Sequence, residues 1–207
     1  MLMVIDDYNI TNLIITTMKT FKLTMIIAII MTFGLIQKSN AQKQSSGLYL
    51  TYNDYLNHKL SYTNSPISIH EFFGGNYVTV ISNGQKLQFE KNKIFGYHDN
   101  ANNDYRFFNN KAYQIVDTNG FCIYSHEKLV PQAGGKGPKP TMVYYFSKKN
   151  DGEILPLAPE YIAKAFVDNT KFRYLVEVAY KSDIKLDAYD DLSHEYKIKE
   201  LYAESLK

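Results

Sequence analysis

Between Tyr77 and Ser147 the chain consists of short runs rich in Val, Ile, Tyr and Phe, separated by Asn, Gly and Asp. Runs of this kind are typical of β-strands joined by tight turns. Asn83-Gly84 and Asn119-Gly120 are the strongest turn signals, because both residue types tolerate positive φ angles. The pattern predicts an antiparallel β-meander of about seven strands. The candidate strands are Tyr77–Ser82, Lys86–Glu90, Lys93–His98, Tyr105–Asn109, Lys111–Asp117, Phe121–His126 and Met142–Lys148.

Glycines and prolines dominate the segment between Leu129 and Thr141. Proline has no N–H to donate to a ladder, and glycine weakens a strand. We therefore expect this segment to be the longest flexible loop of the chain, outside the sheet.

After Pro156 the apolar residues follow a helical period. Pro159 suits a first helical position, and Glu160 favours the positive end of the helix dipole. Apolar residues repeat at helical spacing in three segments, 162–166, 172–179 and 198–205, and Ser193 is a candidate cap for the last. Amphipathic helices must bury their apolar faces, so the sequence predicts an α+β fold with the sheet covered by C-terminal helices.

A shorter helix is expected near residue 52. Thr51 and Asp54 have the spacing of a capping box, in which each side chain accepts a hydrogen bond from the other residue's amide. This pattern predicts a helix over about Tyr52–His58.

Residues 18–41 contain the three parts of a secretory signal peptide. Lys19 and Lys22 supply positive charge, Leu23–Ile36 is apolar, and Ser39-Asn40-Ala41 is a small-x-small cleavage site. We expect translation to start at Met18, with 1–17 as an upstream extension and 42–207 as a single exported α+β domain. The apolar run is shorter than the ~20 residues that cross a bilayer, so an uncleaved membrane anchor is the alternative.

Charge and cysteine content narrow the possible partners. The whole chain carries a formal charge of +2, and removing residues 1–41 takes away three lysines and two aspartates, which leaves a nearly neutral domain. Such a balance does not favour nucleic acid, which is bound by clustered Lys and Arg. The single cysteine, Cys122, cannot form an internal disulfide. We expect an unknown ligand or an envelope or protein partner, with membrane contact only transiently through the signal peptide.

Two groups of residues carry side chains of the types used in catalysis. Cys122 and His126 would lie on one strand with their Cα atoms ~13 Å apart, too far for a nucleophile and its base. His98, Asp99, Asp104 and Arg106 gather at one edge of the predicted sheet and are the best catalytic candidates. The 98–104 segment lacks the ligand spacing of a calcium loop, and Asn and Asp favour turns, so no metal or cofactor is predicted.

Several tyrosines lie on adjacent candidate strands, where they would form either an aromatic binding face or part of the core beneath the helices. Tyrosine offers both a stacking ring and a hydroxyl group, which suits sugars or peptides. The core interpretation is favoured, because helices must cover one face of the sheet. The residues concerned are Tyr105, Tyr113, Tyr124, Tyr144 and Tyr145.

Five segments of the chain resemble uncharacterised exported proteins of Gram-negative bacteria, and the resemblance covers most of residues 47–207. That group has no assigned activity, so the resemblance implies export but assigns no role to any residue. The segments are Thr51–Leu56, Lys93–Tyr97 followed by Tyr105–Phe107, Cys122–Tyr124, and Tyr144–Lys148.

These observations support three hypotheses. The first is a non-enzymatic binding or envelope-associated module in the periplasm or outside the cell. The second is a small exported hydrolase with its site at the His98 to Arg106 sheet edge. The third is an envelope protein tethered by an uncleaved N-terminal segment.

Overall fold

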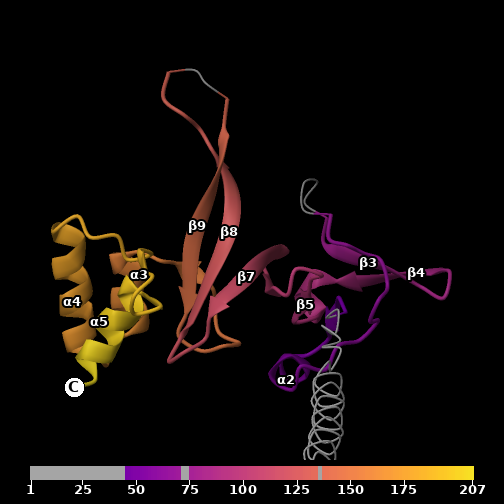
Figure 1. Cartoon of the computed structure of the whole chain (residues 1–207), viewed down its shortest axis with the longest axis horizontal. Helices are drawn as coiled ribbons and strands as arrows, with labels where there is room; N and C mark the ends of the chain where they lie inside the picture. The colour runs from indigo at the N-terminus through magenta and orange to yellow at the C-terminus, as the bar shows by residue number, and fades with distance from the viewer. Residues whose placement is uncertain (1–44, 71–74, 135–136) are drawn as a thin grey trace, which may run out of the picture. The chain divides into compact units, whose positions relative to one another are not determined.

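The computed structural model describes residues 45–70, 75–134 and 137–207, so the expected extension (1–17) and signal peptide (18–41) lie outside the described residues. The described chain has the predicted α+β fold, built on an antiparallel sheet of seven strands (Figure 1). In order across the sheet the strands are β1 (Gly47–Tyr49), β5 (Gly96–His98), β6 (Asp104–Phe108), β7 (Lys111–Asp117), β8 (Cys122–Val130), β9 (Lys139–Ser147) and β10 (Leu155–Pro156).

Tight turns with positive φ angles connect neighbouring strands. The predicted Asn83-Gly84 turn is present, with φ angles of 51° and 76°. Asn109 and Asn110 form a second turn of this kind, between β6 and β7, with φ angles of 48° and 62°. Asparagine tolerates this region better than most residues, which explains why these turns need no glycine at every position.

Two of the predicted meander strands leave the main sheet. β3 (Tyr77–Ser82) and β4 (Gln85–Glu90) pair with β2 (Ile67–Ser68) in a separate three-stranded sheet. A 3-10 turn, η1 (Lys91–Lys93), follows β4, so the strand predicted over Lys93–His98 begins only at Gly96. The prediction that one meander contains all these strands was therefore wrong for β3 and β4. β5 pairs with β1, not with β4.

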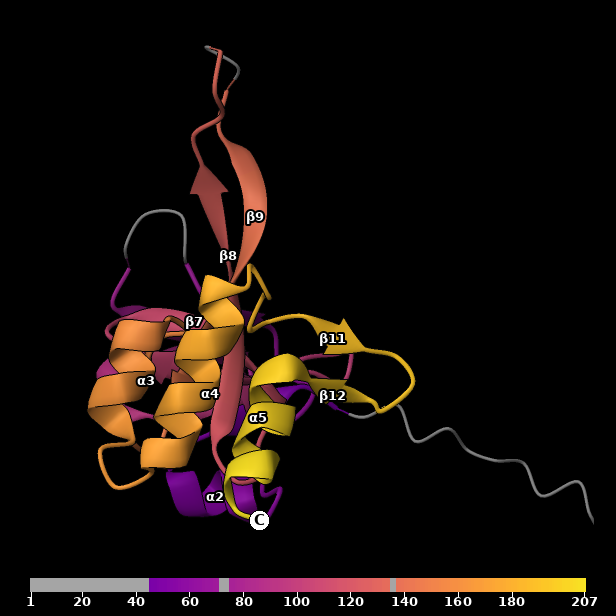
Figure 2. The same cartoon turned by 90° about the vertical axis from the view of Figure 1, so that its left-hand side faces the viewer.

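The expected loop between Leu129 and Thr141 is shorter than predicted. β8 and β9 stay paired as far as Val130 and Lys139, with Pro140 opposite Leu129. Figures 1 and 2 show the two strands extending past the rest of the sheet. Beyond the short β10, the outer side of β9 has no neighbouring strand in the described chain, and proline is tolerated on such an edge.

The three predicted C-terminal helices are present as α3 (Pro159–Ala165), α4 (Thr170–Lys181) and α5 (Lys197–Ser205). They lie against β8 and β9 (Figure 2) and bury one apolar cluster. Ser193 does not cap α5: residues on both sides of it form the short hairpin β11 (Tyr189–Asp190) and β12 (Glu195–Tyr196), so α5 begins after Tyr196. The cluster combines Phe121, Ile123 and Phe146 with Ile162, Phe166, Phe172, Val176, Ile198 and Leu201.

A buried lysine joins α5 to the sheet. The Lys199 amine donates to the main-chain carbonyls of Asn119 and Phe121 and lies 3.0 Å from an Asp117 carboxylate oxygen. Burial lowers the pKa of Lys199, although hydrogen bonding to Asp117 opposes that effect. The amine thus satisfies carbonyls in the turn between β7 and β8 that helix packing would otherwise leave without partners.

The C-terminal helices cover only one end of the sheet face on which they pack. At the other end, Leu48, Phe107 and Ala112 pack against Val78 and Val80 of the three-stranded sheet. Side chains alternate between the two faces of a strand, so the residues between these positions point to the opposite face. Helix α2 (Tyr52–Leu56) and the connection between β9 and β10 pack on that opposite face. This face carries the buried polar and titratable side chains of the candidate site.

The short helix α2 confirms the predicted capping box. The Thr51 hydroxyl accepts from the Asp54 amide at 3.1 Å, and the Asp54 carboxylate accepts from the Thr51 amide at 3.0 Å. The helix ends at Leu56, two residues before the predicted end, and His58 follows with a φ angle of 49°.

Candidate functional site

The first part of the site is a histidine–carboxylate pair between β5 and β6. His98 and Asp104 face each other in the strand register, and His98 Nδ1 lies 2.8 Å from Asp104 Oδ1. The Tyr49 hydroxyl of β1 donates to the same oxygen at 2.8 Å. Burial and this hydrogen bond raise the pKa of Tyr49, so the hydroxyl stays protonated and remains a donor.

Asp99 does not join this pair, although it is the neighbour of His98. Its carboxylate accepts from the amides of Ala101 and Asn103, both at 2.8 Å, and from the Asn103 side chain at 3.0 Å. Partial burial would raise the pKa of Asp99, but these hydrogen bonds outweigh it and lower the pKa. Asp99 therefore shapes the turn between β5 and β6 and is not positioned for catalysis with His98.

Arg106 lies on the same face of β6 as Asp104, but its guanidinium binds other partners. It donates to the Tyr124 hydroxyl at 3.1 Å and to the main-chain carbonyls of Asp151 and Gly152 at 2.9 Å and 2.6 Å. Its central carbon also lies 5.8 Å from the centre of the Phe95 ring. Arg106 thus holds the 148–154 connection against the sheet.

The same connection covers Cys122. The Cys122 thiol donates to the Asn150 side-chain oxygen at 3.2 Å, and burial raises the pKa of the thiol. Nearby, the Tyr124 hydroxyl lies 2.9 Å from the Ser147 hydroxyl, which donates to the Lys149 carbonyl. Cys122 is thus a small buried side chain, 2% exposed.

Seven polar or titratable side chains on this face of the sheet form one group, which we call the buried polar cluster. Its side chains come from five strands of the main sheet, and all of them except Asp104 are fully or almost fully buried. They are Tyr49, His98, Asp104, Arg106, Cys122, Tyr124 and Ser147.

The cluster contains two of the three groups of a nucleophile, base and carboxylate arrangement, namely the imidazole of His98 and the carboxylate of Asp104. A carboxylate that holds one imidazole nitrogen, as Asp104 holds His98 Nδ1, leaves Nε2 to act as a base when a nucleophile lies about 2.6–3.2 Å away. His98 Nε2 is buried without a hydrogen-bond partner among the described residues, and His98 is only 3% exposed. The geometry fixes the ring orientation, but no residue that the structure describes places a nucleophile within hydrogen-bond distance of Nε2.

The predicted aromatic residues divide between the two faces of the sheet. Tyr113, Tyr124 and Tyr145 share the face of the buried polar cluster, and each is at most 7% exposed. Tyr105 and Tyr144 point to the other face, where they pack against the two apolar clusters. The five rings therefore do not form one exposed face, because strand alternation separates them and the covering elements bury them.

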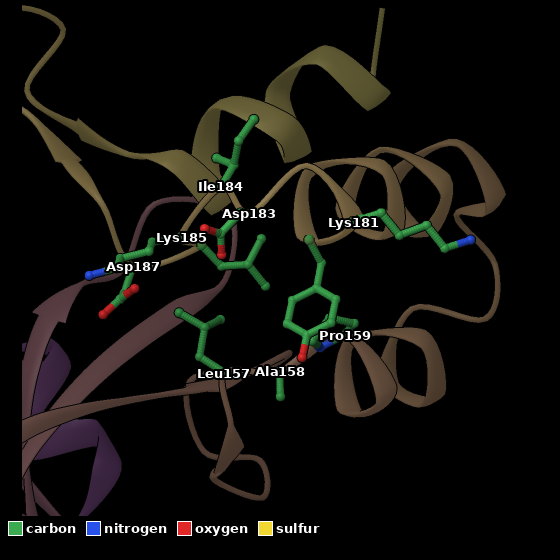
Figure 3. A pocket seen from close by; sticks show the side chains of 10 residues that line it. Leu157, Ala158, Pro159, Lys181, Asp183, Ile184, Lys185 and Asp187 are labelled. Atoms are coloured by element: carbon green, nitrogen blue, oxygen red, sulfur yellow. The ribbon is translucent and has the colours of Figure 1, made fainter.

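An open pocket that the sequence interpretation did not anticipate lies where α3 begins and α4 ends. It encloses about 510 Å³ and combines apolar residues with charged side chains (Figure 3). Lys181 extends away from it and pairs with Glu177 at 2.6 Å. In the sequence, the alternation of charged and apolar residues over 183–187 is the feature that could have indicated this pocket. The lining residues are Leu157, Ala158, Pro159, Tyr180, Lys181, Asp183, Ile184, Lys185, Leu186 and Asp187.

Within residues 45–70, 75–134 and 137–207, no three His, Cys, Asp or Glu side chains are grouped so that they would hold a metal ion. None of the helices in these ranges has the length and apolar content needed to cross a bilayer. Comparison of the chain with protein-family models, curated proteins and solved structures finds no match. The assignment of a function therefore depends on the chain's own sequence and geometry.

Proposed function

We propose that this protein is an exported binding module that acts in the periplasm or outside the cell in association with the envelope. The observation that carries the non-enzymatic part is the burial of the residues best suited to chemistry. His98, Arg106 and Cys122 are 3%, 6% and 2% exposed, and each donates or accepts hydrogen bonds within the fold. A catalytic group must reach its substrate, so such burial favours a structural role.

Export is supported by the signal-peptide pattern of residues 18–41 and by the resemblance to exported proteins of Gram-negative bacteria. Processing after Ala41 would release a nearly neutral domain that begins at Gln42. The tethered alternative requires the apolar run to be retained.

The test is the intact mass of the protein recovered from both the periplasm and the membranes of a Gram-negative host that expresses the whole chain. We expect a species that begins at Gln42. Replacing Ala41 with Tyr should block processing, because the peptidase needs a small residue there, whereas the matched control Asn40→Tyr should be processed normally. A species that retains Leu23–Ile36 would contradict release and favour the tether.

The hydrolase alternative is favoured by one observation, the 2.8 Å contact between His98 and Asp104. It predicts turnover of ester, peptide or phosphate substrates that disappears in Asp104→Asn. The binding proposal predicts no turnover that depends on Asp104. Thermal unfolding of the variant shows whether a lost activity reflects lost chemistry or a lost fold.

A further inference from the structure

A second open pocket lies between helix α3 and the connection from β9 to β10. It encloses about 470 Å³, a volume that suits a small organic ligand. One wall comes from the β9–β10 connection and β10, and the other comes from α3, beside the edge strand of the sheet. We call it the lysine pocket. Its lining residues are Lys148, Lys149, Gly152, Glu153, Leu155, Tyr161, Lys164 and Ala165.

The apolar part of the lining belongs to the outer layer of the core. Leu155, Tyr161 and Ala165 are half-buried and pack against the apolar cluster that the C-terminal helices bury. Contact with the core holds these side chains in place, so they offer an ordered apolar surface to the pocket. Covering such a surface with an apolar group removes both from water, which favours binding.

Three lysines make the lysine pocket electropositive. Lys148, Lys149 and Lys164 line it together with a single carboxylate, that of Glu153. Lys148 is partly compensated by Asp168, whose carboxylate lies 3.5 Å away, but Lys149 and Lys164 form no ion pair with any residue that the structure describes. Like charges around one opening repel each other, and a bound anion relieves this repulsion. The pocket where α3 begins, by contrast, is lined by equal numbers of lysines and aspartates.

The buried polar cluster holds one wall of the lysine pocket in place. The Arg106 guanidinium donates to the Gly152 carbonyl at 2.6 Å, and the Ser147 hydroxyl donates to the Lys149 carbonyl at 2.6 Å. Both bonds fix the backbone of the connection from the side opposite to α3. A wall that is ordered before the ligand arrives loses less conformational freedom on binding, which favours affinity.

We propose that the lysine pocket binds a small organic anion with an apolar body, such as an aromatic carboxylate. The apolar body lies against Leu155 and Tyr161, and the anionic group lies near the amines of Lys149 and Lys164. Neither an uncharged apolar molecule nor a bare inorganic anion makes both contacts. The inference rests on the proposed binding function and names the chemical class of its ligand.

The experiment is isothermal titration calorimetry of the purified protein, in the form in which the host processes it, with three probes. 2-Naphthoate carries both an aromatic body and a negative charge, 2-naphthylmethanol lacks the charge, and inorganic phosphate lacks the apolar body. We expect 2-naphthoate to bind most tightly, with the other two probes at least about tenfold weaker. Raising the ionic strength from about 0.01 M to about 0.15 M should weaken binding of 2-naphthoate only, because salt screens the lysines.

Two variants test the two kinds of contact separately. Lys149→Gln with Lys164→Gln should lower the affinity for 2-naphthoate roughly 25-fold, or about fivefold per lysine, which is the attraction between charges about 4 Å apart in water. Both lysines are exposed, so this variant keeps the fold. Tyr161→Ser should lower the affinities for 2-naphthoate and 2-naphthylmethanol alike, by roughly fivefold to tenfold, and thermal melts check that it remains folded.

The control variant makes the same change of charge elsewhere on the surface. Lys86→Gln with Lys139→Gln removes two exposed lysines outside the lysine pocket and should bind 2-naphthoate as the wild type does. Equal losses in the control and in Lys149→Gln with Lys164→Gln would overturn the proposal. Binding of 2-naphthylmethanol as tight as that of 2-naphthoate would also overturn it.

Other outcomes separate this proposal from the proposed function. Asp104-dependent turnover, together with 2-naphthoate binding that depends on Lys149 and Lys164, would overturn the non-enzymatic function but support the lysine pocket. Folded protein that is processed after Ala41, shows no such turnover and does not bind 2-naphthoate would overturn the lysine pocket and leave the proposed function intact.

Discussion

Replacing Arg106 with Met tests whether the buried polar cluster holds the fold together. The guanidinium makes three hydrogen bonds, to the Tyr124 hydroxyl and to the carbonyls of Asp151 and Gly152. A hydrogen bond from a charged donor contributes about 1.5–3 kcal/mol, but removing the buried charge also relieves its desolvation cost. We therefore expect a net loss of about 2–4 kcal/mol in the free energy of unfolding.

Urea denaturation followed by circular dichroism measures this loss. With an m-value of about 2 kcal/mol/M, the midpoint should fall by about 1–2 M. The matched control is Arg173→Met, because Arg173 is half-buried and its guanidinium donates to the Thr170 hydroxyl at 3.1 Å. The control should lose less than about 1 kcal/mol. If Arg106→Met lost no more than the control, the structural role of the cluster would be refuted.

Two further predictions concern backbone packing and alkaline pH. Gly96→Ala should prevent stable folding, because a Cβ at this position would lie 1.8 Å from the Tyr105 carbonyl oxygen. Gly84→Ala should lower the free energy of unfolding by only about 1 kcal/mol, because Gly84 has a φ of 76° but no atom within 4 Å of the added Cβ. Thermal melts compare the two variants. Stability should fall as pH rises above 10.0, because burial raises the folded pKa of Tyr124 above that ordinary value and that of Tyr55 to about 12. Tyrosine then ionises first in the unfolded chain, which favours unfolding. Urea midpoints measured between pH 9 and 12 should decline, and Tyr124→Phe should decline less steeply.

Local patterns predicted the elements well where the signal lies within a few residues. The Thr51 and Asp54 capping box, the Asn83-Gly84 turn and the three helical periods all appear in the structure. Each of these features depends on backbone conformation and on neighbours within about one or two turns.

Strand neighbours that are distant in sequence were not predictable in this way. β1 pairs with β5 across more than 40 residues, and this choice sends β3 and β4 to a separate sheet. The sequences of the strand segments do not show whether β5 should pair with β1 or with β4. The outer pairing of β8 with β9, as far as Val130 and Lys139, was missed for a different reason, since Pro140 argues against a strand unless one edge lacks a neighbour.

The candidate site was predicted only in part. The short distance in sequence between His98 and Asp104 allowed them to be placed together, and they are in contact. The contacts of Arg106 and Cys122 depend on residues 150–152, which reach them only through the folded connection between β9 and β10. Their burial is a property of the tertiary structure and leaves no local pattern.

The most direct test of the central claim, that the buried polar cluster is closed to substrates, is alkylation of Cys122. It is the only cysteine in the chain, and its thiol lies beneath the connection that Arg106 holds in place. Mass spectrometry should show that iodoacetamide modifies the native protein more than about a thousandfold more slowly than the urea-unfolded chain, because reaction requires opening of the fold. Modification of the native protein within about tenfold of the unfolded rate would contradict the account.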